Sequence, residues 1–197
     1  MVTYLDIPTL TQVLTDAWRL VLAGATDRKS AFHLPTIATV ASDGAPSLRT
    51  VVLREVDAER RILRFHTDNR SPKIQELTAE PRFALHVYDP SIQTQLRFAG
   101  CSRIHHLDDT ARAAWEESAP MSRLCYAATD ATGATVSAPP PAPIQNDVSE
   151  DSGFENFCAV VLTVERLEWL YLLARGHQRA VFQWDASGAC RAEWIAP

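Results

Sequence analysis

Two short stretches place cationic and hydroxyl side chains at a spacing that suits a phosphate group. The first reads Arg49-Thr50-Val51-Val52-Leu53-Arg54, and its alternation and β-branched residues predict a strand with a guanidinium at each end. The second reads Ser71-Pro72-Lys73, which is typical of a helix start. A dianionic phosphate prefers fork-shaped donors, a point charge and the free amides of a helix N-terminus. Together the two stretches could supply all three.

A plainer interpretation of these residues stays open. Arginines that flank a strand are usually solvated, and many helices begin at Ser-Pro without binding a ligand. Near the C-terminus, Arg175, His177 and Arg179 cluster on a predicted turn before a strand. A solvated basic turn explains Arg175 and His177 equally well. Arg179 has Trp169 ten residues upstream and is therefore the better candidate for a binding role.

Other kinds of chemistry find little support in the sequence. His105-His106 and Asp108-Asp109 lack a third ligand at a recognisable spacing, so a strand end followed by an Asp-capped helix explains them better than a metal site. Cys125 has no clear histidine partner, and Ser71 does not lie in a nucleophile elbow. The sequence contains no Gly-rich Rossmann or P-loop fingerprint. We therefore expect no metal, and no catalytic side chain can be named.

The elements that must position these residues are mostly short strands. Apolar residues at helical spacing predict an N-terminal helix over 7–23, with capping-box spacing at Thr9 and Gln12 and a natural stop at Gly24. Shorter helices are predicted over 72–79 and 109–117. Strands are predicted over 36–40, 48–55, 61–67, 83–88, 95–104, 156–164, 169–173, 180–184 and 190–195. Tight turns between the strands favour an antiparallel barrel with flanking helices over a βαβ array.

Residues 118–153 break this pattern. The proline-rich run 138–143 can continue neither a helix nor a sheet. We expect a long loop or an extended arm, which could cross to a partner subunit, because long unstructured segments inside compact domains are usually functional or disordered. Neither an internal repeat nor a second domain is evident, so the prediction is a single domain over 1–197.

Composition limits the broad class of the protein. The chain has 197 residues, of which 46% are hydrophobic and 22% charged, as in ordinary soluble domains. A formal net charge of -5 argues against a nucleic-acid partner. No apolar run reaches membrane-spanning length and no signal-peptide pattern occurs. The scattered cysteines are expected to be buried thiols in a reducing compartment, the cytoplasm. They are Cys101, Cys125, Cys158 and Cys190.

The order of these motifs resembles the pyridoxamine 5′-phosphate oxidase family of FMN-binding split barrels. That family carries an Arg-x-Val-Leu-Leu-Lys strand, a Tyr-Thr pair on the next strand, a Ser-Arg-Lys helix start, a later glutamine, and a tryptophan followed ten residues on by an arginine. The matching residues here are Arg49–Arg54, His66-Thr67, Ser71-Pro72-Lys73, Gln95, Trp169 and Arg179. The closing residues 193–197 resemble the family's Arg-Leu-Ala-Pro ending. The match covers about 36–103 and 156–197.

The resemblance implies a split β-barrel that binds FMN at the interface of a homodimer. The implied FMN-binding residues are Arg49, Thr50, Val51, Val52, Leu53, Arg54, His66, Thr67, Ser71, Lys73, Gln95, Trp169 and Arg179. Within this set, Arg49, Ser71 and Lys73 would hold the phosphate. Trp169 and Arg179 would come from the other subunit. Arg54, Arg123, Arg175 and His177 would face a small-molecule substrate. In such an enzyme a reduced donor passes hydride to the flavin, which oxygen reoxidises.

Departures from the family pattern leave the substrate open. The family lysine that touches flavin and substrate is Arg54 here, and the segment that should grip a substrate phosphate offers Ser118, Ser122 and Arg123 beside two glutamates. Two nearby carboxylates repel a phosphate, so we expect weak turnover of pyridoxamine and pyridoxine phosphates with FMN binding intact. A flavin reductase, a deazaflavin-dependent reductase, a non-catalytic flavin-binding or sensing protein and a haem-binding relative remain alternatives.

Overall fold

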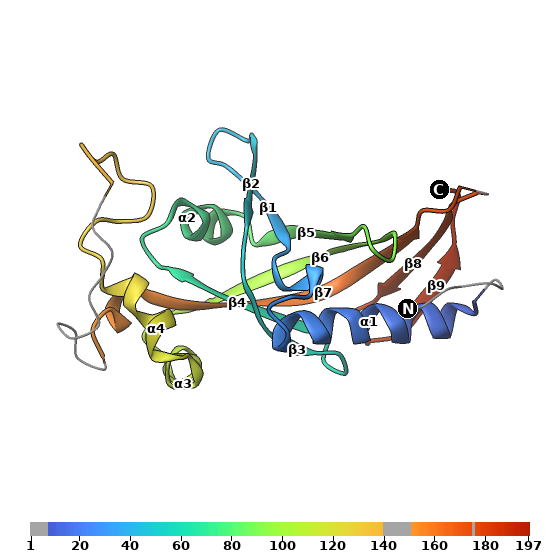
Figure 1. The fold of residues 1–197 in the computed structure, drawn as a ribbon, viewed down its shortest axis with the longest axis horizontal. Helices are drawn as coiled ribbons and strands as arrows, with labels where there is room; N and C mark the ends of the chain where they lie inside the picture. The colour runs from blue at the N-terminus through green and yellow to red at the C-terminus, as the bar shows by residue number, and fades with distance from the viewer. Residues whose placement is uncertain (1–7, 140–150, 175) are drawn as a thin grey trace.

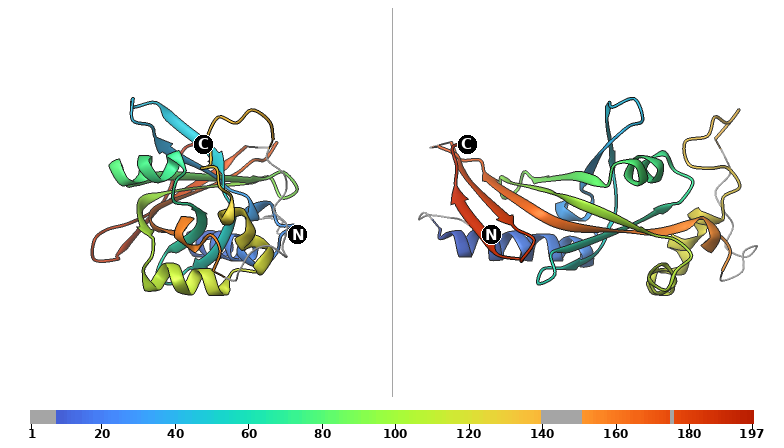
Figure 2. Two further views of the ribbon diagram at one scale, coloured as in Figure 1. Left: turned by 90° about the vertical axis from the view of Figure 1, so that its left-hand side faces the viewer. Right: turned by 180° about the vertical axis from the view of Figure 1, so that it is seen from behind.

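The computed structural model describes residues 8–139, 151–174 and 176–197. Within these ranges nine strands form one antiparallel sheet with helices against it (Figures 1 and 2). The strands are β1 (Thr36–Val40), β2 (Pro46–Thr50), β3 (Leu53–Asp57), β4 (Ile62–Asp68), β5 (Arg82–Asp89), β6 (Thr94–His105), β7 (Phe157–Tyr171), β8 (Gln178–Trp184) and β9 (Cys190–Trp194). The predicted fold class, an antiparallel split barrel with flanking helices, is confirmed.

The strand order explains why the barrel is split. The sheet runs β2-β1-β5-β6-β7-β4-β3, and β8 and β9 extend it beside β7. The chain crosses from one end of this row to the other between Thr50 and Leu53, where no strand pairing closes the sheet. The predicted single strand over 48–55 is therefore wrong at Val51 and Val52. Each half pairs with a different neighbour, and the Val51 amide donates to Pro35 O at 2.9 Å instead.

The longest strand, β7, has 15 residues and joins the parts of the sheet. It pairs with β4 through its first half, with β8 through its second half, and with β6 along most of its length. The sequence predicted two strands here, and the structure corrects this to one. The pairing of β6 with β7 shifts its register between Ala99 and Gly100 of β6. A Cβ on Gly100 would lie 2.0 Å from Thr163 O, so the close approach requires glycine.

Helix α1 (Leu10–Thr26) has the predicted capping box between Thr9 and Gln12, but it begins and ends three residues later than expected. Gly24 does not stop it. A Cβ at this position would lie 2.4 Å from Phe32 O, so the glycine lets the following turn (η1, Ala31–His33) pack closely. Helices α2 (Pro72–Ala79) and α3 (Asp109–Glu117, capped by Asp108) are confirmed as predicted. No described helix is long and apolar enough to cross a membrane.

Two hydrophobic clusters hold the molecule together. The larger one fills the barrel and contains Trp18, Phe65, Phe98 and Leu167. The smaller one lies between α3 and the first half of β7, where the Trp115 ring packs edge-on against Phe157 with 5.3 Å between centroids. Burial on both sides of β7 explains why its first residues are apolar without alternation. The smaller cluster also packs the segment that follows α3 against β7.

The described part of 118–153 is more ordered than the predicted loop. It contains α4 (Pro120–Arg123) and the short 3₁₀ turn η2 (Leu124–Ala127), and a second such turn, η4 (Phe154–Asn156), follows directly after it. Arg123 ends α3 by donating to Ser118 O at 3.0 Å and Glu116 O at 2.8 Å. The loop prediction is wrong for 120–127, and its part over 140–150 lies outside the described residues.

The four cysteines are free thiols, but they are not all buried as the sequence predicted. Cys158 is buried and Cys101 is half-buried, whereas Cys125 and Cys190 are exposed. The prediction is thus wrong for the last two. Cys190 begins the outermost strand β9, and Cys125 lies on the surface turn η2, where the larger hydrophobic cluster does not reach.

Candidate cofactor site

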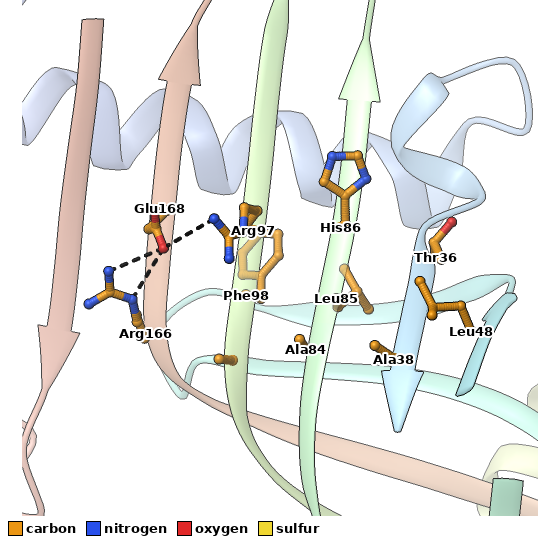
Figure 3. A pocket seen from close by; sticks show the side chains of 11 residues that line it. Thr36, Ala38, Leu48, Ala84, Leu85, His86, Arg97, Phe98, Arg166 and Glu168 are labelled. Carbon is orange, nitrogen blue, oxygen red and sulfur yellow. Dashed lines mark hydrogen bonds and ion pairs between the residues drawn. The ribbon is translucent and has the colours of Figure 1, made fainter. Parts of the chain in front are cut away.

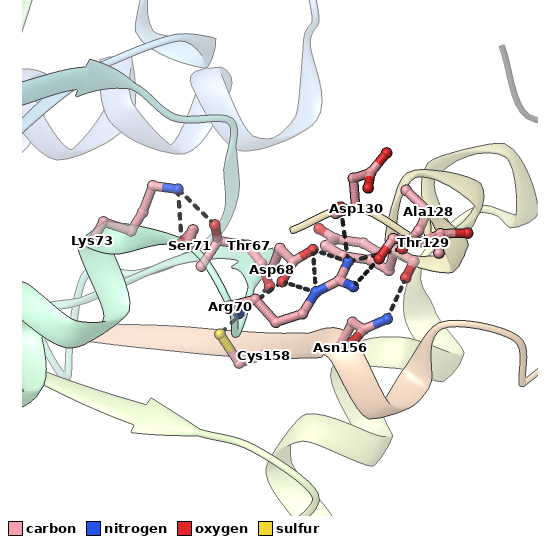
Figure 4. A network of polar contacts seen from close by, with 11 residues as sticks. Thr67, Asp68, Arg70, Ser71, Lys73, Ala128, Thr129, Asp130, Asn156 and Cys158 are labelled. Atoms are coloured by element: carbon pink, nitrogen blue, oxygen red, sulfur yellow. Dashed lines mark hydrogen bonds and ion pairs between the residues drawn. The ribbon is translucent and has the colours of Figure 1, made fainter. Parts of the chain in front are cut away.

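A cationic corner forms where β4 ends and α2 begins. Thr67 lies near the end of β4, and Ser71 is the residue before the first helical position, Pro72. The Ser71 hydroxyl does not cap the helix; the Lys73 ammonium instead donates to it at 3.2 Å and to Thr67 Oγ1 at 2.9 Å (Figure 4). Ser71 is fully buried. The predicted phosphate-binding serine and lysine therefore meet at one point.

Arg49 of β2 lies beside this corner. Its guanidinium donates to Glu76 Oε2 at 2.6 Å, to Ser47 Oγ at 2.6 Å and to the Thr39 hydroxyl. Burial raises the pKa of Glu76, but hydrogen bonds from Thr39 and Arg49 outweigh that effect and hold it below its usual value. The sequence interpretation missed this carboxylate. A signal was present, because Glu76 follows Lys73 by one helical turn and so shares its face.

The electrostatics of the corner favour an anion. Burial lowers the pKa of Lys73, and the positive charge of Arg49 lowers it further. The contacts that the ammonium makes are to hydroxyl groups, and no carboxylate among the described residues lies within ion-pair distance of it. A buried cation that faces a second cation is costly unless an opposite charge approaches. A phosphate would relieve both costs, so the donor set fits the phosphate end of FMN.

His66 points to the other face of β4, toward α3. Ser118 Oγ donates to Ala114 O at 2.8 Å, so it accepts from His66 Nδ1 at 3.3 Å. This assignment leaves Nε2 as the acceptor nitrogen, and it is buried without a hydrogen-bond partner among the described residues. Burial, together with the charges of Arg64 and Arg54, lowers the pKa of His66 to about 3. The imidazole is therefore neutral at ordinary pH.

A second arginine ties a loop to the start of α2. Arg70 donates to Asp68 through Nε at 3.0 Å and Nη2 at 2.7 Å. The same guanidinium donates to Thr129 O at 3.0 Å and to Ala128 O at 2.9 Å, with Asp130 O at 3.4 Å (Figure 4). We call 128–130 the strap. It lies beside Arg70, on the side away from Lys73 (Figure 4), and no motif in the sequence pointed to it.

Two predicted flavin residues, Trp169 and Arg179, lie at the opposite end of β7. Arg179 of β8 donates to the Glu168 carboxylate, with Nε at 3.0 Å. Trp169 lies in the core with its side chain fully buried, stacked on Tyr171 with 5.8 Å between centroids and edge-on to Trp194 at 6.2 Å. Contact between Trp169 and a flavin stays a prediction.

The two groups of residues are too far apart to share one ligand within a single chain. Thr67 pairs with Cys158 of β7, and Arg179 pairs with Leu170 of the same strand. The stretch of β7 between these two positions spans roughly 35–40 Å at 3.3 Å per residue. Figure 1 shows α2 in the left half of the molecule and the β8–β9 hairpin at its right end.

The other predicted site residues have varied surroundings. Val51 and Leu53 belong to the core, Thr50 is exposed, and Val52 and Arg54 are half-buried. Gln95 Oε1 accepts a hydrogen bond from His86 Nε2 at 3.0 Å. His177 is exposed on the turn before β8, Arg123 is engaged at the end of α3, and Arg175 lies outside the described residues. Their roles toward flavin or substrate stay predictions.

Comparison with known proteins relates the chain to one family. Residues 15–106 match the family model described as pyridoxamine 5′-phosphate oxidase, FMN-binding domain. The pyridoxine/pyridoxamine 5′-phosphate oxidase of Caulobacter vibrioides is 40% identical over 65 residues, which are 33% of this chain and 28% of that protein. The chain thus matches under a third of that relative's length. The pyridoxine/pyridoxamine 5′-phosphate oxidase 2 of Arabidopsis thaliana is 28% identical over 91% of this chain and 94% of that protein.

Solved structures extend the likeness to the whole fold. A pyridoxamine 5′-phosphate oxidase-related, FMN-binding protein from Nostoc punctiforme is 25% identical, covers 92% of this chain and 96% of its own, and has a TM-score of 0.74. PhzG from Burkholderia lata, solved with tetrahydrophenazine-1-carboxylic acid, shares the fold at 20% identity over 98% of this chain and 96% of its own, with a TM-score of 0.69. The predicted resemblance is thereby confirmed: the chain is similar in sequence and in fold to the pyridoxamine 5′-phosphate oxidase-like FMN-binding split barrels.

Proposed function

We propose that this protein is an FMN-dependent oxidoreductase that works as a homodimer. The phosphate of FMN would bind to Arg49, Ser71 and Lys73 of one subunit, and Trp169 and Arg179 would come from the other. The observation that carries the proposal is Lys73, a half-buried ammonium that contacts two hydroxyl groups and faces a second cation. The family supports flavin as the group that supplies the missing anion.

Each side chain of the corner has a defined task toward the phosphate. Lys73 supplies a point charge and Arg49 a guanidinium, and charge-assisted hydrogen bonds of this kind are roughly twice as strong as neutral ones. Ser71 can donate its hydroxyl proton once Lys73 turns to the ligand, because that hydroxyl does not cap α2. When bound, the flavin would accept and return hydride equivalents. The protein supplies position and charge.

The substrate is a small molecule whose class the corner does not determine. Arg123, the arginine nearest the expected substrate-phosphate segment, is engaged with the carbonyls of Ser118 and Glu116. Arg64 Nη2 forms an ion pair with Glu117 Oε2 at 2.6 Å. These contacts support the expectation of weak turnover of pyridoxamine and pyridoxine phosphates.

The test compares FMN with riboflavin, which has no phosphate. Mass and absorbance spectra of the cofactor released from the purified protein should identify FMN. Lys73→Ala and Arg49→Ala should each weaken FMN binding by about 1.5–3 kcal/mol, since each removes a charge-assisted contact. Riboflavin binding should change little. Fluorescence quenching titrations of both ligands would measure the difference.

The chain offers a matched control. Lys29 is the only other lysine in the sequence and it is exposed near the end of α1. Lys29→Ala should leave both affinities at the wild-type value. If Lys73→Ala weakens FMN and riboflavin equally, the phosphate does not bind at this corner. A Soret band in the purified protein would show that it binds haem instead of FMN. A deazaflavin mass would show that it binds a deazaflavin instead.

A further inference from the structure

A groove opens between helix α1, the turn from β3 to β4 and the end of β8. Helix α1 lines it with Leu14, Trp18 and Leu22, while Arg61 lines it from the turn and Trp184 from β8. Its volume is about 670 Å³, within the roughly 300–1,000 Å³ of sites that bind small molecules. The groove is therefore large enough for a ligand of that size.

This groove lies away from both groups of predicted flavin residues. Helix α1 packs on β3, β8 and β9, whereas α2, which carries Lys73, packs on β1 and β6. Trp184 ends β8 and Arg179 lies near its start, roughly 15–17 Å away at 3.3 Å per residue. The hollow in Figure 3 differs in this respect, because its Glu168 also binds Arg179. The groove shares no residue with the cationic corner or with the Arg179 end.

The wall that α1 contributes is an apolar stripe. Leu14, Trp18 and Leu22 follow one another at intervals of four residues, so they lie on one side of the helix. The stripe is roughly 12 Å long at 1.5 Å per residue. Leu14 and Trp18 also pack against the core, whereas Leu22 is 48% exposed. An elongated apolar chain matches a stripe of this shape better than a single ring does.

Arg61 has a backbone conformation that an arginine rarely adopts. Its φ angle is 58°, in the left-handed region that glycine enters without steric cost. The pairing of the strands fixes this conformation, because Val164 N donates to Arg61 O at 2.9 Å. Residues held in this region often serve a function. An arginine at a position that suits glycine directs attention to its side chain.

The guanidinium of Arg61 has a cation–π contact but no anionic partner. Its Cζ lies 5.5 Å from the centre of the Trp184 ring, and its buried Nε has no hydrogen-bond partner. Among the described residues, no carboxylate lies within ion-pair distance of it. Arg19, the other arginine of the groove, pairs with Asp16 at 3.3 Å. Arg61 therefore brings an uncompensated positive charge to an otherwise largely apolar groove, and a buried N–H without a partner is costly.

We propose that this groove binds a medium-chain fatty acid, with its carboxylate on Arg61 and its chain along Leu14, Trp18 and Leu22. The planar fork of a guanidinium matches the two oxygens of a carboxylate, and burial of the chain against the stripe drives binding. Glu59 also lines the groove, but it is exposed to solvent. It would repel a dianion about twice as strongly as a monoanion. The charge and the shape therefore point to a single carboxylate on an apolar chain.

Octanoate is the probe that tests the groove. 1-Octanol is its neutral counterpart with a similar chain, and acetate has the carboxylate without the chain. Isothermal titration calorimetry on the full protein should detect octanoate, and the other two compounds should bind at least tenfold more weakly. Arg61→Gln should weaken octanoate binding about tenfold, the equivalent of roughly 1.4 kcal/mol. Leu22→Glu should weaken it at least as much, because it puts a carboxylate at an exposed helix position beside the chain.

Two matched controls change the same residue types outside the groove. Arg60 is exposed on the same turn and does not line the groove, so Arg60→Gln should leave octanoate affinity unchanged. Leu34 is 53% exposed, and Leu34→Glu should also have no effect. Equal octanoate affinity in wild type and Arg61→Gln, or in wild type and Leu22→Glu, would overturn the proposal. So would equal binding of 1-octanol, or no binding at about 10 mM octanoate, tenfold above a 1 mM dissociation constant.

The same samples separate this groove from the cofactor proposal. Arg61 and Leu22 belong to neither group of predicted flavin residues, so the flavin content of Arg61→Gln and Leu22→Glu should match that of the wild type. Lys73→Ala should lose flavin and keep the wild-type affinity for octanoate. Normal flavin content without octanoate binding would refute the fatty-acid site and leave the proposed function in place.

Discussion

At the scale of single residues, His66 makes folding stability depend on pH. The pKa of His66 falls from 6.5 to about 3, mainly through burial. Between these values the unfolded chain binds a proton at this imidazole and the folded protein does not. Stability therefore decreases as pH falls through this window, by about 1.4 kcal/mol per pH unit. His66→Gln should remove about 2–3 kcal/mol of the loss between pH 6.5 and 4.5, measured by urea unfolding at several pH values.

The control for this measurement is His177, which is exposed on the turn before β8. His177→Gln should reproduce the wild-type pH dependence. The comparison uses the slope of stability against pH, so a constant destabilisation by His66→Gln does not affect it. Parallel slopes for His66→Gln and wild type would mean that the imidazole is protonated in the folded protein at mild pH.

Structural features of single residues could be predicted from the sequence where they depend on neighbours along the chain. The Ser71–Lys73 helix start and the Asp108 cap follow from short-range rules, and both appear in the structure. Contacts between distant segments were not predictable. Glu76 reaches Arg49 because α2 packs on β1, the neighbour of β2. Glu168 contacts arginines from three strands. Such pairings depend on register, which a single sequence specifies weakly.

At the scale of elements, Arg70 connects the strap 128–130 to the end of β4. Asp68 is only 7% exposed, so Arg70→Ala would leave its carboxylate buried without its main partner. Removing one partner of a buried ion pair costs about 3–5 kcal/mol. We expect Arg70→Ala to lower stability by that amount and to speed hydrogen exchange of the strap amides. Exchange mass spectrometry on the native protein would measure the second effect.

An exposed pair provides the comparison for this prediction. Arg191 and Glu193 of β9 contact at 2.7 Å with side chains 75% and 45% exposed. Arg191→Ala should cost less than about 1 kcal/mol, as exposed pairs do. If the strap exchanges at the same rate in Arg70→Ala and Arg191→Ala, then Arg70 does not hold it in place. The sequence could not predict the contact with the strap, because Arg70 binds backbone carbonyl groups there, and every residue type has such a group.

At the scale of the whole molecule, the length of β7 implies that a flavin site built from both groups of residues must combine two subunits. The cationic corner and Arg179 lie roughly 35–40 Å apart along this strand, so one chain cannot bring both to one flavin. An isologous dimer, the commonest assembly, would place the corner of each subunit beside the Arg179 end of the other. Light scattering should therefore give a dimer. A monomer that retains full flavin would contradict the shared site.

Mixing two defective subunits tests the same geometry more sharply. Lys73→Ala damages the corner and Arg179→Ala damages the opposite end, so each homodimer should bind FMN weakly at both sites. A mixed dimer would contain one intact site, built from Lys73 of one subunit and Arg179 of the other. After refolding an equimolar mixture, roughly a quarter of all sites should regain wild-type affinity if subunits pair at random. The matched control mixes Lys73→Ala with Arg49→Ala. Both changes lie in the corner, so no mixed dimer can restore a site, and recovered affinity in this control would place Arg49 and Lys73 in different sites.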